Sequence, residues 1–235
     1  MQREVLTERF FTALISGARS DAQDLIDQAL TANCPADKIL NRLFWPTLQH
    51  IQKLYRGDQI SPLGFNYATR MMRSLVAQLQ PRLERSEERQ DRVMVVSGAE
   101  QSEELAAQIV SDLLEADGYN VFYVGGGIAN DEIVAELGRI KVDVLVVFGA
   151  VPATVPQTRL LIDRLHDIGV CPALQIVVGG GVFGRAEGLA EEVGSDLWAN
   201  DPEQIVAAMA EKRDQRMTPS QRTVGRRRRG NKDAA

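Results

Sequence analysis

The 235-residue chain has few of the side chains that bind metals or form covalent cross-links. Cys34 and Cys171 are its only cysteines, and their wide separation fits neither a disulfide framework nor a cysteine-based zinc site. Its two histidines, His50 and His166, have no Asp, Cys or Ser partner at a spacing typical of a catalytic site. We therefore expect no catalytic residues and no metal ligands, and we interpret both histidines as structural or surface residues.

Long apolar runs are also missing from the sequence. No stretch approaches the roughly 18 residues of a membrane-spanning helix, and the N-terminal residues do not form the apolar core of a signal peptide. Together with two unpaired cysteines, this predicts a cytoplasmic protein without membrane contact. A composition of 44% apolar and 25% charged residues is ordinary for a globular protein, and the length allows two modest domains.

Charge is distributed unevenly along the chain. Nine of the 27 Lys and Arg, but two of the 32 Asp and Glu, lie from Lys212 onward, so the preceding residues carry a formal charge of −12. Residues 214–235 are poor in apolar side chains and contain Arg226–Arg229, which predicts a disordered basic tail. One interpretation is contact with nucleic acid or an acidic partner, and the other is a solvating extension without a specific partner.

Residues 1–88 have the pattern of a helical domain. Apolar residues recur at helical spacing, and breaks near residues 17–21, 33–35 and 57–62 predict four helices, at 3–16, 20–32, 36–55 and 62–84. Ser61 followed by Pro62 is typical of a helix start, and Pro46 is expected to bend the third helix. Short loops favour an antiparallel four-helix bundle, with the charged stretch 84–91 as the linker that follows.

Residues 89–213 alternate between strand and helix patterns. Strands are predicted at 92–97, 120–124, 144–148, 175–178 and 197–199, with helices at 101–117, 130–140, 156–168, 185–193 and 202–213. This alternation predicts an α/β fold, a flavodoxin-like doubly wound five-stranded parallel sheet. Ligands bind beyond the carboxyl ends of such strands, so the loops at 98–102, 149–155 and 179–184 are expected to form the site.

Three sequence segments carry a resemblance to a known family. Ile109–Val121 and Val193–Asp201 are similar to parts of the cobalamin (vitamin B12)-binding domain, and Ile51–Ser61 resembles the end of a helix in its helical cap. The chain resembles this family nearly throughout, as found in methionine synthase, corrinoid proteins and cobalamin-dependent regulators. The resemblance implies a helical cap followed by a flavodoxin-like domain, with cobalamin or a related tetrapyrrole as ligand.

The ligand motifs of that family are altered in this chain. Its Asp-x-His-x-x-Gly motif falls on Gln101–Ala106, so Glu103 stands where the family has the histidine that binds cobalt. Its Ser-x-Leu motif corresponds to Gly149–Val151, whereas its late Gly-Gly is retained. The resemblance implies these cofactor-binding candidates: Ser102, Glu103, Gly149, Ala150, Val151, Gly179, Gly180, Gly181, and in the cap Tyr55, Phe65 and Asn66.

Several of these residues also have structural interpretations. An acidic residue such as Glu103 is favoured in the first turn of a helix by the helix dipole. Gly179, Gly181 and Gly184 fit the dinucleotide-binding motif G-x-G-x-x-G. That motif belongs in the first strand–helix turn of a nucleotide-binding fold, whereas these glycines lie in the fourth. The alternative to nucleotide binding is that they leave room for a flat ligand or for loop packing. Tyr55 and Phe65 can be interpreted as core residues of the helical domain instead of ligand contacts, because aromatic residues are common in helical cores.

Three functions remain open at this stage. The first is a non-catalytic regulatory or sensory module that binds a corrinoid or similar tetrapyrrole without a histidine lower ligand, or has lost the ligand. In it, ligand binding would shift the cap and the α/β domain toward one partner-binding state. The second is a corrinoid carrier for methyl transfer, and the third is a ligand-free interaction scaffold. The resemblance implies a protein partner, either a regulator or a methyltransferase, and a homodimer.

Overall fold

The computed structural model describes residues 2–149 and 151–217. The chain divides after Ser86 into two compact units. Arg226–Arg229 and most of the predicted basic tail lie outside the described residues.

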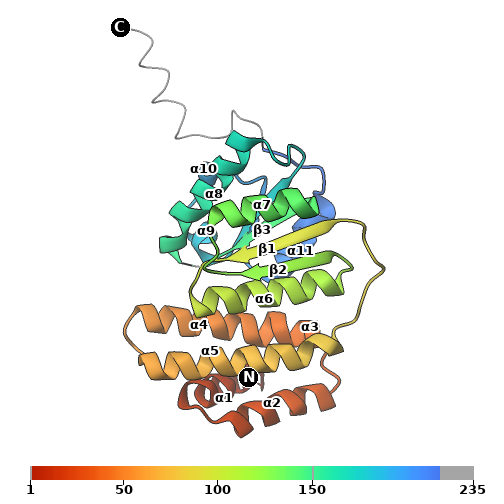
Figure 1. Cartoon of the computed structure of the whole chain (residues 1–235). Coiled ribbons are helices and arrows are strands. Elements are labelled where there is room, and N and C mark those ends of the chain that lie inside the picture. Colours follow the sequence, from red (N-terminus) through yellow and green to blue (C-terminus); the bar gives the residue numbers. More distant parts are fainter. Residues whose placement is uncertain (1, 150, 218–235) are drawn as a thin grey trace. The chain divides into compact units, whose positions relative to one another are not determined.

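The first unit is a bundle of four helical segments, as the sequence predicts. Helix α1 packs against α2 and α5, and the rings of Phe10 and Phe44 meet at a centroid distance of 5.1 Å in its core. Ser61 caps α5 by accepting a hydrogen bond from the Gly64 N–H at 3.1 Å. The elements are α1 (Gln2–Ser16), α2 (Arg19–Thr31), α3 (Ala36–Ile39), η1 (Leu40–Phe44), α4 (Trp45–Arg56), α5 (Pro62–Leu79) and η2 (Gln80–Arg82) (Figure 1).

The third helical segment contains a π-helical turn, where the sequence predicts a bend at Pro46. The turn η1 ends directly before α4, and the Trp45 N–H donates to the carbonyl of Leu40, five residues earlier. Proline has no N–H and its ring clashes with the carbonyl four residues before it, here that of Arg42. The wider turn accommodates this proline within a continuous helical segment.

The second unit is a five-stranded parallel sheet with the strand order β2-β1-β3-β4-β5. This order confirms the predicted flavodoxin-like fold. The strand order reverses between β1 and β3, which places the topological switch point there. The strands are β1 (Arg92–Ser97), β2 (Asn120–Gly125), β3 (Val144–Phe148), β4 (Gln175–Gly179) and β5 (Leu197–Ala199).

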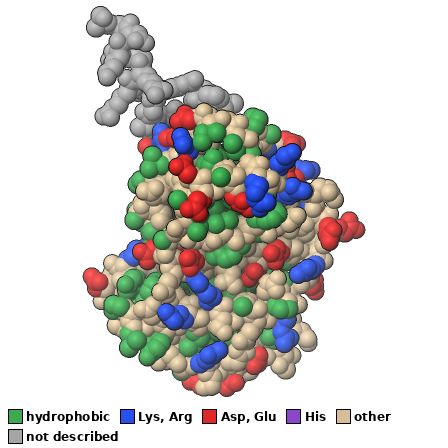
Figure 2. All heavy atoms as spheres, viewed as in Figure 1, with side chains coloured by type: hydrophobic (Ala, Val, Ile, Leu, Met, Phe, Trp, Pro, Cys, Tyr) green, Lys and Arg blue, Asp and Glu red, His purple; other side chains and the backbone are tan. Residues whose placement is uncertain are grey.

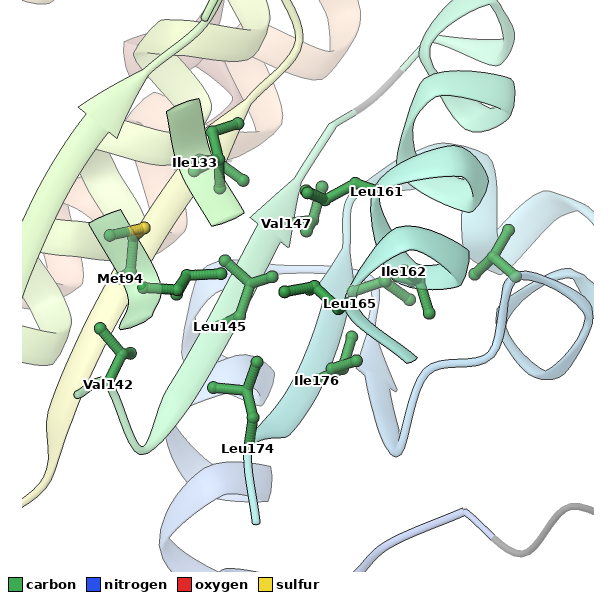
Figure 3. Packing of buried hydrophobic residues seen from close by; sticks show 14 of the residues in the cluster. Met94, Ile133, Val142, Leu145, Val147, Leu161, Ile162, Leu165, Leu174 and Ile176 are labelled. Atoms are coloured by element: carbon green, nitrogen blue, oxygen red, sulfur yellow. The ribbon is translucent and has the colours of Figure 1, made fainter. Parts of the chain in front are cut away.

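Helices cover both faces of this sheet. Helices α6 (Gln101–Ala116) and α11 (Pro202–Glu211) contact each other on one face, and α7 (Asn130–Ile140) and α8 (Val155–Ile168) contact each other on the opposite face (Figure 1). Beneath α7 and α8, side chains such as Met94, Leu145 and Ile162 form a continuous apolar core (Figure 3). The predicted helix at 185–193 is shortened to α10 (Leu189–Val193), which begins after Gly188 with its positive φ of 77°, and a separate short helix, α9 (Gly181–Arg185), precedes it.

A short C-terminal segment, Lys212–Met217, crosses the amino ends of the strands, and we call it the C-terminal strap. The Gln175 side-chain amide donates to the carbonyls of Lys212 at 2.9 Å and Gln215 at 3.1 Å. The Met217 N–H donates to Asp196 Oδ1 at 2.6 Å, and Arg213 forms an ion pair with Asp91. The strap is therefore fixed at the edge of the sheet that lies opposite the carboxyl ends of the strands.

The surface carries both signs of charge. On the face seen in Figure 2, Lys and Arg side chains are interspersed with Asp and Glu over the part of the chain that the structure describes. None of the helices within residues 2–149 and 151–217 combines the length and the apolar character needed to cross a lipid bilayer.

Candidate functional site

The carboxyl edge of the sheet is built largely from glycine-containing loops. The backbone ladder continues past the strand ends, because the Gly149 N–H donates to the Gly179 carbonyl at 3.0 Å and the Gly180 N–H to the Ala199 carbonyl at 3.2 Å. The candidate glycines that follow β3 and β4 are thus hydrogen-bonded to neighbouring strand ends. Ala150 lies outside the described residues.

Glu103 is the third residue of α6, and its side chain is fully buried. Its Oε1 atom lies 3.0 Å from the Thr154 hydroxyl oxygen and 3.3 Å from the Val151 backbone nitrogen. Burying a carboxylate is costly unless it accepts hydrogen bonds, and these two donors provide them. The carboxylate therefore joins the helix after β1 to the loop after β3.

Two glycines leave room for this carboxylate. A Cβ atom at Gly149 would lie 3.1 Å from Glu103 Oε1, and one at Gly98 would overlap Glu103 Oε2 and the methyl group of Thr154. Any larger residue at Gly98 would displace the Glu103 side chain or the loop that holds Thr154. Close packing thus depends on Gly98, a residue that is not among the candidates from the sequence.

The glycine-rich turn after β4 serves packing. A Cβ atom at Gly179 would lie 2.5 Å from the ring of the fully buried Phe148 and 3.0 Å from Ile205 Cδ1. At Gly184 a Cβ would overlap the side-chain amide of Asn200. These contacts favour the loop-packing interpretation of the G-x-G-x-x-G letters over a nucleotide site.

Ser102 is also buried on α6, with 3% of its surface exposed. At the carboxyl edge of the sheet, Glu103 contacts both Gly149 and Val151. Gly179 joins this group through its hydrogen bond with Gly149. Gly180 has a φ of 108°, which a residue with a side chain rarely adopts, and Gly181 begins α9. Sequence reasoning identifies the loop that holds Thr154 but misses this residue as the partner of Glu103.

The cap candidates lie at the turn between α4 and α5. The rings of Tyr55 and Phe65 are stacked, with centroids 4.1 Å apart and planes inclined by 14°. Phe65 is 7% exposed, and Asn66 beside it is half-buried. The two aromatic residues therefore pack on each other within the helical unit.

The carboxyl edge fits one mode of corrinoid binding poorly. A cofactor that takes its lower ligand from α6 would need the side chain at position 103 to point out of the protein. The Glu103 carboxylate is instead buried and bonded to Thr154 and Val151. Among residues 2–149 and 151–217, no three His, Cys, Asp or Glu side chains are grouped as metal ligands.

Comparisons with known proteins give matches to both the helical unit and the α/β unit. A family model described as "B12 binding domain" matches residues 91–210, and a second model with the same description matches residues 6–80. Monomethylamine corrinoid protein 2 of Methanosarcina acetivorans is 21% identical over 206 residues, covering 86% of this chain and 94% of that protein. Dimethylamine corrinoid protein 1 of the same organism is 22% identical over 120 residues, covering 50% and 55%.

A solved structure has the same fold. The Methanosarcina barkeri monomethylamine corrinoid protein superposes with a TM-score of 0.78 at 18% sequence identity, covering 88% of this chain and 98% of that one. At 18% identity, this similarity shows a shared arrangement of helices and strands and nothing about function.

Proposed function

From the fact that this chain belongs to the B12-binding domain family, we propose that it is a corrinoid-carrying protein that serves a partner methyltransferase. The observation that carries this proposal is the extent of the similarity to monomethylamine corrinoid protein 2, which includes both the helical unit and the α/β unit. A lone binding domain would match over the second unit alone.

In this proposal the corrinoid lies against the carboxyl edge of the sheet and receives no ligand from α6. Glu103 holds the loop after β3 through Val151 and Thr154, so its role is to shape the edge. The backbone of the loops that contain Gly98 and Gly149 would form the surface that the ring contacts. The partner methyltransferase would supply the catalytic groups.

A second candidate function is the regulatory or sensory module, and Glu103 is the observation that favours it. A residue locked into the protein at the position of the family's metal-binding histidine is compatible with a fold that binds a tetrapyrrole without acting on it. Ligand binding would then shift a conformational equilibrium, and no residue would need to do chemistry.

Visible spectroscopy of the purified full-length protein tests both proposals. Hydroxo-, methyl- and adenosylcobalamin, and haem as a comparison, are added in turn, and each mixture is passed through gel filtration. Coelution of a cobalamin is expected, with the same spectrum in the Glu103→Ala and Glu103→Gln variants. If no tetrapyrrole is retained, both proposals fail and a ligand-free scaffold remains.

Remethylation is a requirement that the carrier must meet and the sensor need not. The protein-bound cobalamin is reduced chemically and then treated with methyl iodide. A carrier is expected to regain the spectrum of bound methylcobalamin. Bound cobalamin that cannot be remethylated would exclude the carrier and leave the regulatory module.

A further inference from the structure

A cavity of about 400 Å³ opens beside the carboxyl ends of β1 and β3, on the face covered by α7 and α8. It lies at the switch point of the sheet, where open α/β folds bind their ligands. Its volume falls within the range of roughly 300–1,000 Å³ that is typical of small-molecule sites. Gly149 is the one candidate residue of the sequence among its described lining, and the lining from α7 and α8 lies outside the residues of the corrinoid proposal.

The floor of the cavity is apolar. It is formed by Val96 at the end of β1, Val147 near the end of β3, Ile133 of α7 and Leu161 of α8. Figure 3 shows Ile133, Val147 and Leu161 approaching one another from these three elements, at the end of the core nearest the β3 arrowhead. Such a floor favours contact with the face of an aromatic ring.

The rim of the cavity is polar but uncharged. Hydroxyl and amide groups come from Ser97, Asn130, Thr154, Gln157 and Thr158, and none of the described lining side chains is ionisable. The Asn130 amide donates to the Gln157 carbonyl at 3.4 Å, a long contact that a ligand acceptor can replace. Amide side chains of this kind pair with the donor and acceptor edge of a heterocyclic base.

The charges near the mouth disfavour an anion. Asp131 and Glu132 are exposed in the first turn of α7, directly after the lining residue Asn130. Asp131 already forms an ion pair with Arg164 at 3.3 Å. Pro156 removes one N–H from the first turn of α8, which weakens that helix end as a phosphate site.

We propose that this cavity binds an uncharged, flat heterocycle of nucleoside size, with its ring against the apolar floor and its polar edge toward Asn130 and Gln157. The cavity adjoins the surface of the corrinoid proposal at Gly98, Gly149 and Thr154, but this inference rests on the lining of the cavity and not on corrinoid binding. It adds a second class of ligand to the same end of the sheet.

Titration calorimetry of the full-length, cobalamin-free protein with adenosine tests this proposal, with ligand-observed NMR as a second readout. Saturable binding of adenosine is expected. AMP, which carries the same base and a phosphate, is expected to bind at least about tenfold more weakly, a difference of about 1.4 kcal/mol.

Two tryptophan variants locate the site. Ala129 is exposed at the cavity mouth, so Ala129→Trp is expected to weaken adenosine binding at least about tenfold without disturbing the core. Ala135→Trp, at an exposed position of the same helix away from the cavity, is the matched control and should leave binding unchanged.

Three results would overturn the proposal. They are no saturable binding of adenosine at millimolar concentration, adenosine binding that Ala129→Trp leaves unchanged, and AMP binding as tight as that of adenosine. Because cobalamin is absent from the assay, none of these results bears on the corrinoid titration.

Discussion

Glu103 Oε1 lies 3.0 Å from the Thr154 hydroxyl oxygen, although 51 positions separate the two residues in the sequence. The same hydroxyl lies 2.8 Å from the Val151 carbonyl, and its single hydrogen can be donated to one acceptor at a time. The Val151 N–H, at 3.3 Å, is a second donor to Glu103. Glu103 therefore forms a hydrogen-bonded cross-link between α6 and the loop after β3.

Removal of this cross-link is expected to destabilise the α/β unit. Glu103→Ala should lower the free energy of unfolding by about 1–3 kcal/mol, because the half-buried Val151 N–H loses its acceptor and the Thr154 hydroxyl loses one of its two. Glu103→Gln should cost less, since its amide oxygen can still accept a hydrogen bond. Urea unfolding followed by circular dichroism measures both, with the exposed Glu100→Ala as control. A cost for Glu103→Ala no larger than for the control would contradict the assignment.

Asp112 on α6 should make stability depend on pH. Burial, assisted by the nearby charge of Glu115, raises the pKa of its carboxyl from 3.8 to about 7. Between these values the unfolded chain loses the proton while the folded protein keeps it, so the contribution of Asp112 to stability falls as pH rises from about 4 to 7 and stays low above it.

Asp112→Asn removes this loss. The variant should match the parent near pH 4 and be more stable by on the order of 2–4 kcal/mol at pH 8. Urea unfolding at several pH values measures the difference, and the exposed Asp24→Asn variant serves as control. A difference between variant and parent that does not change with pH would exclude a raised pKa.

The C-terminal strap should contribute to stability through Asp196. Its two carboxylate oxygens accept hydrogen bonds from the Ile176 N–H at 2.7 Å and the Met217 N–H at 2.6 Å. Asp196→Ala is therefore expected to lower the free energy of unfolding by about 1–3 kcal/mol. It should also increase amide hydrogen exchange at Met217. Unchanged exchange at Met217 would mean that the carboxylate does not hold the strap.

Thr47 offers a stabilising substitution in the helical unit. Its side chain is fully buried, and its hydroxyl has no hydrogen-bond partner among the described residues. Thr47→Val replaces this hydroxyl with a methyl group of similar size and should raise the free energy of unfolding by about 1 kcal/mol. Thr31→Val, at an exposed position where the hydroxyl donates to the Asp27 carbonyl, should give no gain. Equal effects of the two substitutions would argue against an unpaired hydroxyl.

The sequence predicts the architecture well because the fold is built from strongly patterned elements. Each predicted strand agrees with the structure to within one residue, since buried β-rich runs alternate with amphipathic helices in a parallel sheet. The π-helical turn before Pro46 escapes prediction, because helical spacing of apolar residues does not distinguish a four-residue from a five-residue hydrogen bond. Likewise, the late start of α10 after Gly188 depends on a backbone angle that periodicity does not report.

The sequence predicts which segments form the candidate site but not which side chains contact each other there. The spacing of the motifs predicts that Glu103 and the loop at 149–155 share one site, and the structure brings Glu103 into contact with Val151 and Thr154 of that loop. Whether the carboxylate points outward or toward Thr154 depends on the register of β1 against β3 and on the space left by Gly98. Both are features of the tertiary structure, and the sequence of one segment does not determine them.

The strap has a practical consequence for experiments on this protein. Because Met217 is held by Asp196 at the amino end of β5, the described chain leaves the sheet at the end farthest from Gly98 and Gly149. A fluorophore attached at position 217 would therefore be anchored on the side of the α/β unit remote from the loops at the carboxyl edge. Surface immobilisation through that position should leave those loops accessible to molecules in solution.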